Sequence, residues 1–324
     1  MPPTLTDTLR QYLPLFGYLS LAAFSAMLAY AALPREGRLF VRGPWSAAAM
    51  SIATLAAALG IWHASSIENA IVLLISSTVA CLLFCPAVAM LAAPRTDNKP
   101  PVVRNVLGTQ GFPLALCILL IGFASQFTIA AVVGMAILGV VTLDLGAATK
   151  APRQEAPRPG SRLAFLAILF ALLPAALVGF CTSQAAIFAA DAFLSAPVDI
   201  LIVNLLCPML LIPILRHTTR QASRGDLASS MDQCTLIAAV NLGIFLPLLC
   251  VAWGLLHQTA DQPLPLPHLN SVSWRLDGSM LLVSAMALMG LRFRMLRASR
   301  WLSFVLVILY AAYLMASTLL RIKL

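Results

Sequence analysis

The 324-residue sequence predicts an all-α polytopic membrane protein with ten transmembrane helices in two inverted five-helix repeats. Three observations lead to this prediction. The composition is 60% hydrophobic and 10% charged, whereas a soluble domain has about 25% charged residues. Apolar runs recur that approach or exceed the ~20 residues needed to cross a bilayer. A short polar sequence also occurs twice, half a chain apart, and each copy precedes an apolar run.

Two pairs of related segments carry the internal repeat. Residues 65–70 (Ser-Ser-Ile-Glu-Asn-Ala) and 229–234 (Ser-Ser-Met-Asp-Gln-Cys) both read Ser-Ser-apolar-acid-amide-small, at an offset of 164 residues. Residues 40–44 (Phe-Val-Arg-Gly-Pro) and 193–197 (Phe-Leu-Ser-Ala-Pro) form a second pair, at an offset of 153 residues. Two membrane-embedded halves in tandem are typical of secondary transporters.

We expect ten spans, and the positions of the basic residues support that number. The predicted spans are residues 12–33, 45–63, 69–93, 106–125, 127–148, 163–193, 198–215, 233–257, 276–291 and 301–320, and the long sixth is expected to break near residues 179–183. Of the 21 Lys and Arg residues, 17 follow odd-numbered spans, and the others are Arg10, Arg275, Arg321 and Lys323. All five of those loops then share one face, which the positive-inside rule makes cytoplasmic. Both termini are expected outside, in a bacterial inner membrane.

The same topology makes the two halves antiparallel. Span one runs inward and span six runs outward, so residues 1–148 and 163–324 are expected to form inverted repeats joined by a cytoplasmic linker, residues 149–162. Residues 65–70 then lie on the outer face and residues 229–234 on the inner face. This is the geometry of alternating-access transporters, in which the substrate binds near the midplane between the repeats.

The sequence offers no support for an enzyme or a cofactor. Almost all of the seven cysteines lie within apolar runs, so we expect them to be small buried hydrophobes. No nucleophile–base pair, Gly-rich phosphate loop or His-Glu-x-x-His pattern appears. The net charge of +9 lies mostly in loops between spans, which favours membrane orientation over nucleic-acid binding. Expected partners are membrane lipids and a monovalent or divalent cation, and a protein partner stays open.

Two acids near span ends are the first candidates for an ion path. Glu68 and Asp232 each follow paired serines, and acids near a membrane are costly and usually functional. The alternative is that each caps a helix N-terminus and complements the helix dipole. The two roles are compatible.

Four neutral polar residues within the spans complete the candidate set. Asn204 and Asn241 lie deep in spans seven and eight, where interhelical hydrogen bonding is the alternative role. Ser77 and Thr78 lie in span three, where hydroxyls alternatively bond to their own helix backbone. Prolines in spans three and eight are expected to break those helices, which either frees carbonyls for a monovalent cation or makes a simple kink.

Several segments resemble the calcium/cation antiporter superfamily, which includes the sodium/calcium exchangers. Residues 190–196 (Ala-Asp-Ala-Phe-Leu-Ser-Ala) are similar to the Gly-Ala-Asp-x-Leu-Val-x-Gly-Ala start of the second helix in each repeat, and residues 38–43 resemble the other copy. Residues 224–228 resemble the turn into the third helix, and residues 300–314 the last helix. The resemblance implies ten spans in inverted five-span repeats, with both termini outside.

The sequence departs from the family pattern where the cation is bound. The family places Gly-Thr-Ser-x-Pro-Glu in the second helix of each repeat and Gly-Ser-Asn in the third. Here spans 45–63 and 198–215 contain no Glu, and their only acid is Asp199. A divalent ion such as Ca²⁺ takes about six to eight oxygens, several of them charged. The resemblance therefore implies a cation antiporter with a weakened or altered ion site. A non-transporting scaffold derived from that fold and a ten-span carrier of an organic solute are the alternatives.

Overall fold

The computed structural model describes residues 5–32, 44–94, 128–148, 161–192, 198–258, 265–267, 271–292, 296 and 298–322. Every regular element in these ranges is a helix, which confirms the predicted all-α class for the described part of the chain. Nine of the ten predicted spans coincide with helices. The other, residues 106–125, lies outside the described ranges.

The described part of the first half of the chain contributes three simple helices and one composite helix. These are α1 (Leu5–Ala32), α2 (Pro44–Ala64), α3–η1–α4 (Ile67–Val79, Ala80–Phe84, Cys85–Ala92) and α6 (Ile129–Ala148), where η marks a π-helical turn. The second half contributes α7 (Ser161–Ala192), α8–η2–α9 (Val198–Leu201, Ile202–Leu206, Cys207–Leu210), α10 (Ile212–Ser223), α11–η3–α12 (Leu227–Val240, Asn241–Phe245, Leu246–Leu256), α13 (Ser271–Arg292) and α14 (Arg300–Ile322).

Several of these helices are long and apolar enough to cross a membrane. Five qualify singly among the described residues: Leu13–Ala31, Ile67–Ala92, Phe170–Ala190, Leu227–Leu256 and Arg300–Arg321. The pair Ile202–Leu210 and Ile212–Ser223 forms a sixth candidate span, bent by 50°. The chain is therefore an integral membrane protein.

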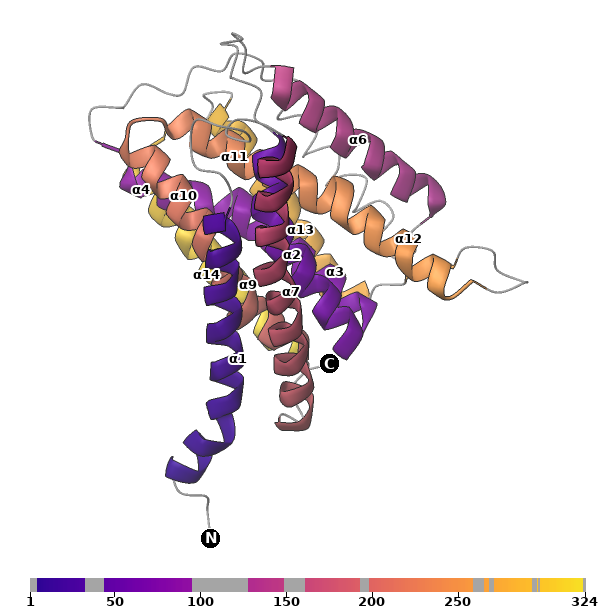
Figure 1. Cartoon of the computed structure of the whole chain (residues 1–324). Coiled ribbons are helices and arrows are strands. Elements are labelled where there is room, and N and C mark those ends of the chain that lie inside the picture. Colours follow the sequence, from indigo (N-terminus) through magenta and orange to yellow (C-terminus); the bar gives the residue numbers. More distant parts are fainter. Residues whose placement is uncertain are drawn as a thin grey trace.

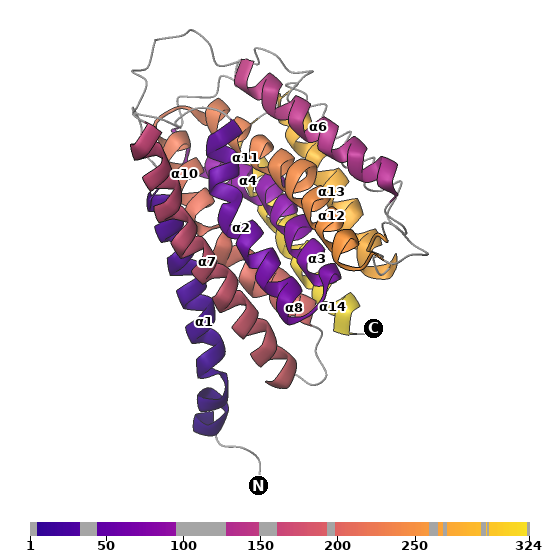
Figure 2. The ribbon, with the colours of Figure 1, turned by 45° about the vertical axis from the view of Figure 1, so that its right-hand side comes forward.

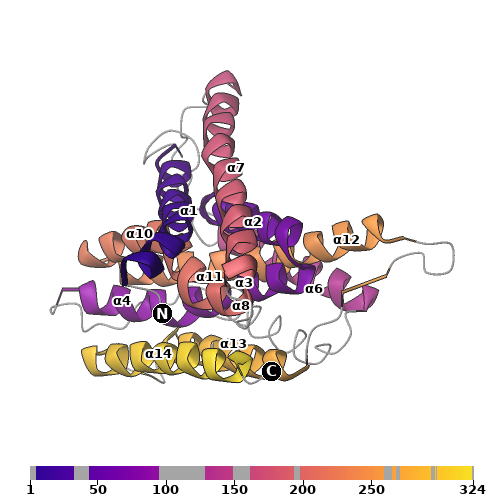
Figure 3. The same ribbon diagram turned by 90° about the horizontal axis from the view of Figure 1, so that it is seen from below.

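The helices lie in layers, with the two longest composite helices at the centre. Figure 3 shows α13 and α14 along one side of the molecule and α1 and α7 on the opposite side, with α3, α4, α11 and α12 between them. In the most apolar stretches of Ile67–Ala92 and of Leu227–Leu256, 83% of the residues are buried, against 28% in that of Arg300–Arg321. The six cysteines in the described ranges are buried, as predicted. The centre of the fold is therefore the pair α3–η1–α4 and α11–η3–α12 (Figure 1).

These two composite helices run in opposite directions. The end of α4 lies beside the start of α11, and α3 begins at the side of the molecule where α12 ends (Figure 2). Each helix has the same internal order of α-helix, π turn, proline and α-helix. This matching order in antiparallel helices agrees with an inverted repeat. The boundaries at residues 149–162 stay a prediction, because residues 149–160 lie outside the described ranges.

The predicted break in the sixth span is wrong. Helix α7 is continuous from Ser161 to Ala192, and its Gly179 makes a close helix–helix contact instead. A Cβ atom placed on Gly60 of α2 would lie 2.1 Å from the carbonyl oxygen of Gly179. The small residues thus let two backbones touch, as is common in membrane helices. The sharp bend lies in span seven, between α9 and α10, where Pro213 is the second residue of α10.

Candidate functional site

In the part of the chain that the structure describes, three π-helical turns lie in the interior, and a proline follows each one. The turns η1, η2 and η3 end two residues before Pro86, Pro208 and Pro247. Proline has no N–H, and its ring clashes with the carbonyl four residues earlier. In all three helices the residue before the proline donates its N–H to the carbonyl five residues back. One carbonyl in each helix therefore loses its usual donor, and π turns of this kind are frequent at functional sites.

Asn241, the first residue of η3, has the least satisfied buried polar side chain on these turns. Its side chain is fully buried, and neither its Nδ2 nor its Oδ1 has a hydrogen-bond partner among the described residues. The alternative of interhelical hydrogen bonding is therefore not realised there. A buried amide left without partners costs about 1–3 kcal/mol, so its retention favours a ligand that supplies the missing contacts.

Ser77 and Thr78 are neighbours on α3 but play different roles. Both are buried, and the hydroxyl of Thr78 donates to the carbonyl of Leu74 at 2.7 Å, as the backbone-bonding alternative expects. The hydroxyl of Ser77 has no hydrogen-bond partner in the described part of the chain. Helix α3 packs against both η2 and η3. Ser77 therefore joins Asn241 as an unsatisfied polar group of the interior.

Asn204 lies within η2 and is half satisfied. Its Nδ2 donates to the hydroxyl of Thr318 on α14, which confirms the interhelical bond for that atom. Its Oδ1 is buried and has no partner among the described residues. On helix α2, which packs against α3 and η3, the buried hydroxyl of Ser51 also has no hydrogen-bond partner among the described residues. The unsatisfied buried groups on α2, α3, η2 and η3 are thus all uncharged.

Glu68 lies at the molecular surface, in the first turn of α3. The hydroxyl of Ser66, the N-cap, accepts a hydrogen bond from the backbone N–H of Asn69 at 3.2 Å. The Glu68 side chain is exposed and complements the positive end of the helix dipole. The capping alternative therefore describes this copy of the repeat.

Asp232 has a different place from Glu68. Helix α11 begins at Leu227, six residues before the predicted start of span eight, so Asp232 is the sixth helical residue and is half-buried. The cap is Asp226, whose Oδ1 accepts from the backbone N–H of Ser229 at 3.1 Å. Gly225 precedes it with a φ of 86°, which an L residue rarely adopts. The capping role is therefore wrong for Asp232, because a better cap lies earlier in the chain.

This earlier start also changes the register of the repeat. Aligned at their caps, Ser66 matches Asp226, and Glu68 then matches Ala228. The two acids that the sequence pairs are not structurally equivalent. Of the six predicted site residues, the fold draws Ser77, Asn204 and Asn241 onto contacting central elements and leaves Glu68 at the rim.

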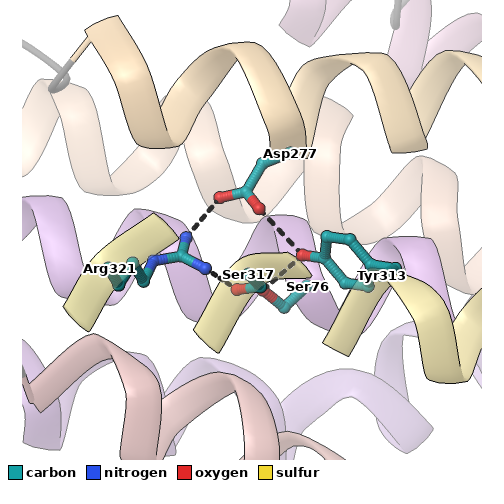
Figure 4. Close-up of polar contacts among 5 residues, drawn as sticks. All are labelled: Ser76, Asp277, Tyr313, Ser317 and Arg321. Atoms are coloured by element: carbon teal, nitrogen blue, oxygen red, sulfur yellow. Dashed lines mark hydrogen bonds and ion pairs between the residues drawn. The ribbon is translucent and has the colours of Figure 1, made fainter. Parts of the chain in front are cut away.

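A buried ion pair, absent from the six predicted site residues, joins the last two helices. Asp277 of α13 and Arg321 of α14 are 1% and 2% exposed, and Arg321 Nη2 lies 2.7 Å from Asp277 Oδ2 (Figure 4). The hydroxyl of Tyr313 donates to Asp277 Oδ1 at 2.9 Å and lies 3.3 Å from the hydroxyl of Ser76. Arg321 Nη1 also donates to Ser317. Asp277 is the only acid in the predicted span nine, and a single acid within an apolar span is the sequence signal that could have identified it.

The comparison with known proteins rests on structure alone. No protein-family model matches the sequence, and no curated protein matches it. The solved structure of native YfkE matches with a TM-score of 0.67 at 10% identity, over 95% of this chain and 91% of that one. The H⁺/Ca²⁺ exchanger CAX matches with a TM-score of 0.57 at 14% identity, over 100% and 90%. The sodium–calcium exchanger NCX_Mj matches with 0.57 at 15% identity, over 94% and 96%.

This is the cation-exchanger fold. The match spans almost the whole of each chain, so the predicted likeness to the calcium/cation antiporters is confirmed at the level of fold. At 10–15% identity the likeness does not extend to the ion or the chemistry. In spans 45–63 and 198–215, where the family pattern has glutamates, the buried polar atoms without a hydrogen-bond partner among the described residues belong to the neutral Ser51 and Asn204.

Proposed function

We propose that the protein is a secondary cation transporter, an antiporter of the exchanger fold with an altered ion site that selects a monovalent cation. The observation that carries this proposal is Asn241, a fully buried amide with neither polar atom satisfied among the described residues, at the start of a π turn. Ser77 on the adjoining helix α3 supports it. Both sit on the central antiparallel helices, where alternating-access carriers bind their substrate.

The neutral character of the site favours a monovalent ion. A dehydrated divalent cation needs several carboxylates to compensate its charge. The oxygens of Ser77 and Asn241, with carbonyls freed by the prolines, carry only partial charges. Carbonyls of unwound helix segments coordinate Na⁺ in transporters. We therefore expect Na⁺ or a similar ion to bind more tightly than Ca²⁺.

The proposed topology follows the same fold. Residues 1–148 and 163–324 form the two repeats, with residues 149–162 as a cytoplasmic linker and both termini outside a bacterial inner membrane. Arg216, Arg220 and Arg224 on and just after α10 support this orientation, because basic residues collect on the cytoplasmic side.

Counterflow in proteoliposomes tests the proposal. Vesicles loaded with unlabelled Na⁺ should accumulate labelled Na⁺ through the wild-type protein. Asn241→Leu should reduce this accumulation to the level of protein-free vesicles, because it removes both polar atoms from the site. Asn69→Leu, the same change at the rim of α3, is the matched control and should leave counterflow in place. Asn241→Asp should increase the competition by Ca²⁺, because it adds a negative charge.

Two results would contradict the proposal. Counterflow at the wild-type level in Asn241→Leu would show that the ion path does not include η3. Absence of counterflow for every cation, from protein that elutes as a single folded species, would favour the non-transporting scaffold, for which a protein partner would then be sought.

A further inference from the structure

The ion pair of Asp277 and Arg321 is buried between two helices of a membrane protein. Both side chains are almost fully buried, and their mutual attraction must offset the loss of hydration of two charges. Well-packed hydrophobic residues often match or exceed the stability of such a pair. Ionisable residues inside membrane proteins are rare for this reason and usually belong to ion or proton paths.

The net charge of the Asp277–Arg321 cluster decides whether Asp277 binds a proton. With both groups ionised the cluster has no net charge, since Tyr313, Ser317 and Ser76 are neutral. If Arg321 moves away, Asp277 is left as a buried anion that has lost its counter-ion, which is strongly unfavourable. A proton bound at Oδ2, the atom that Arg321 contacts, restores neutrality. Departure of the guanidinium and uptake of a proton are therefore coupled.

Arg321 lies where such a departure is feasible. It is the penultimate residue of α14, which ends at Ile322. A long arginine side chain near a helix end reaches the membrane surface by changing its rotamers. Its other contact in the cluster is the hydroxyl of Ser317, one turn earlier on the same helix.

The cluster also reaches the candidate ion path. Tyr313 has one hydroxyl hydrogen, which it gives to Asp277, so Ser76 must donate to the Tyr313 oxygen. Ser76 precedes Ser77, the unsatisfied hydroxyl of α3. A change in the charge of Asp277 is thus transmitted through two hydrogen bonds to the helix that carries Ser77.

The elements packed against α13 offer no competing acid in the described part of the chain. These are α14, α3 and η1. Helix α14 provides Arg321 and Tyr313, and the charged residue of α3 is Glu68, which is exposed at the far end of the helix. The titratable residue of η1 is Cys81, a buried thiol. On α13 itself Arg275 is exposed.

From this geometry we propose that Asp277 is a proton-binding residue of the transport cycle, with Arg321 as its counter-ion in the unprotonated state. The inference rests on the proposed transport function and names the coupling ion. A proton from the outer aqueous phase binds Asp277 Oδ2 as Arg321 leaves, and it is released when Arg321 returns. The O–H bond at Asp277 forms as one O–H bond of a hydronium ion breaks, and release to water reverses this exchange.

Infrared difference spectroscopy tests proton binding without any need for transport. In Arg321→Gln the carboxyl of Asp277 should be protonated at neutral pH and give a carboxylic C=O band. The band should be absent from the double variant Arg321→Gln/Asp277→Asn, and absent from Arg275→Gln, the matched control on α13. Absence of the band in folded Arg321→Gln would overturn the proposal. If that variant does not fold, wild type and Asp277→Asn are compared on acidification, and a band restricted to wild type is the supporting result.

Transport then tests coupling. A proton gradient should drive Na⁺ accumulation through wild type, and in Asp277→Asn the ratio of proton-driven uptake to counterflow should fall at least tenfold. An unchanged ratio would overturn the proposal. Wild-type protein without counterflow would defeat the proposed function instead, and the infrared result would still show whether Asp277 exchanges its arginine for a proton.

Discussion

Replacing Gly243 by alanine should push η3 away from α6 and destabilise the protein. Gly243 is the third residue of η3, and its backbone contacts Gly139 of α6. A Cβ at Gly243 would lie 2.3 Å from the Cα of Gly139, 3.0 Å from its nitrogen and 3.2 Å from the carbonyl oxygen of Met135. These are all backbone atoms, so no side-chain rotation relieves the clash.

The size of the loss follows from these distances. A Cβ essentially never lies closer than 3.0 Å to another heavy atom, so the 2.3 Å approach requires the two helices to separate. Overpacking of this kind costs about 1–3 kcal/mol. The better helix propensity of alanine offsets up to about 1 kcal/mol of that cost. Because the 2.3 Å approach is to a backbone atom, the upper part of the overpacking range, about 2–3 kcal/mol, applies, and the free energy of unfolding should fall by ~1–2 kcal/mol. Counterflow should fall as well, since Asn241 lies two residues away.

Reversible unfolding in mixed micelles measures the change, and Gly17→Ala is the matched control. A Cβ on Gly17 of α1 meets nothing within 4 Å, so alanine there should be neutral or should stabilise by up to ~1 kcal/mol. Gly139→Ala should resemble Gly243→Ala, because its Cβ would lie 2.6 Å from the Cα of Gly243. Equal stability of Gly243→Ala and Gly17→Ala would refute direct contact between η3 and α6.

Three further substitutions test other contacts by thermal denaturation in detergent. Gly60→Ala should destabilise by ~1–3 kcal/mol, because its Cβ would lie 2.1 Å from the oxygen of Gly179; a neutral result would exclude the close approach of α2 and α7. Asp226→Ala should lower the free energy of unfolding by about 1 kcal/mol, because it removes the N-cap of α11. Ser229→Ala should lower it little, and a larger loss for Ser229→Ala than for Asp226→Ala would support the helix start predicted from the sequence. Tyr313→Phe should cost ~1–3 kcal/mol, because it removes a donor from a buried carboxylate; in a double-mutant cycle with Ser76→Ala, a coupling energy of zero would disprove the bond between them.

Much of the architecture could be predicted, because a membrane-spanning helix requires a long apolar run and its orientation depends on the basic residues of its loops. The apolar runs locate nine described helical spans, and the basic residues predict their alternation across the bilayer. The prolines at positions 86 and 247 also mark the places where the helices become π-helical. These features depend on local composition, so no knowledge of packing was needed. Asn204 and Asn241 were found for the same reason, as polar residues within apolar segments.

The rest depended on which residues meet in space. Gly179 looked like a helix break, but the space it leaves is filled by α2. The pairing of Glu68 with Asp232 followed a sequence match, whereas the start of α11 is determined by Gly225 and Asp226. The ion pair escaped because its members are 44 positions apart and Arg321 lies just beyond the predicted span. The only sign of the ion pair in the sequence was the single acid in span nine, Asp277.

The long separation of Asp277 and Arg321 also has a consequence for biogenesis. Helix α13 does not qualify alone as a membrane span, whereas α14 does. At roughly 5–20 residues per second, a ribosome needs ~2–9 s to synthesise the chain from Asp277 to Arg321. An aspartate costs about 2.5–3.5 kcal/mol at the centre of an inserting helix on the translocon scale, and Asp277, the seventh residue of α13, adds part of that cost while it is unpaired. We therefore expect α13 to wait at the insertion machinery until α14 has been made, and the two to enter the bilayer as a hairpin.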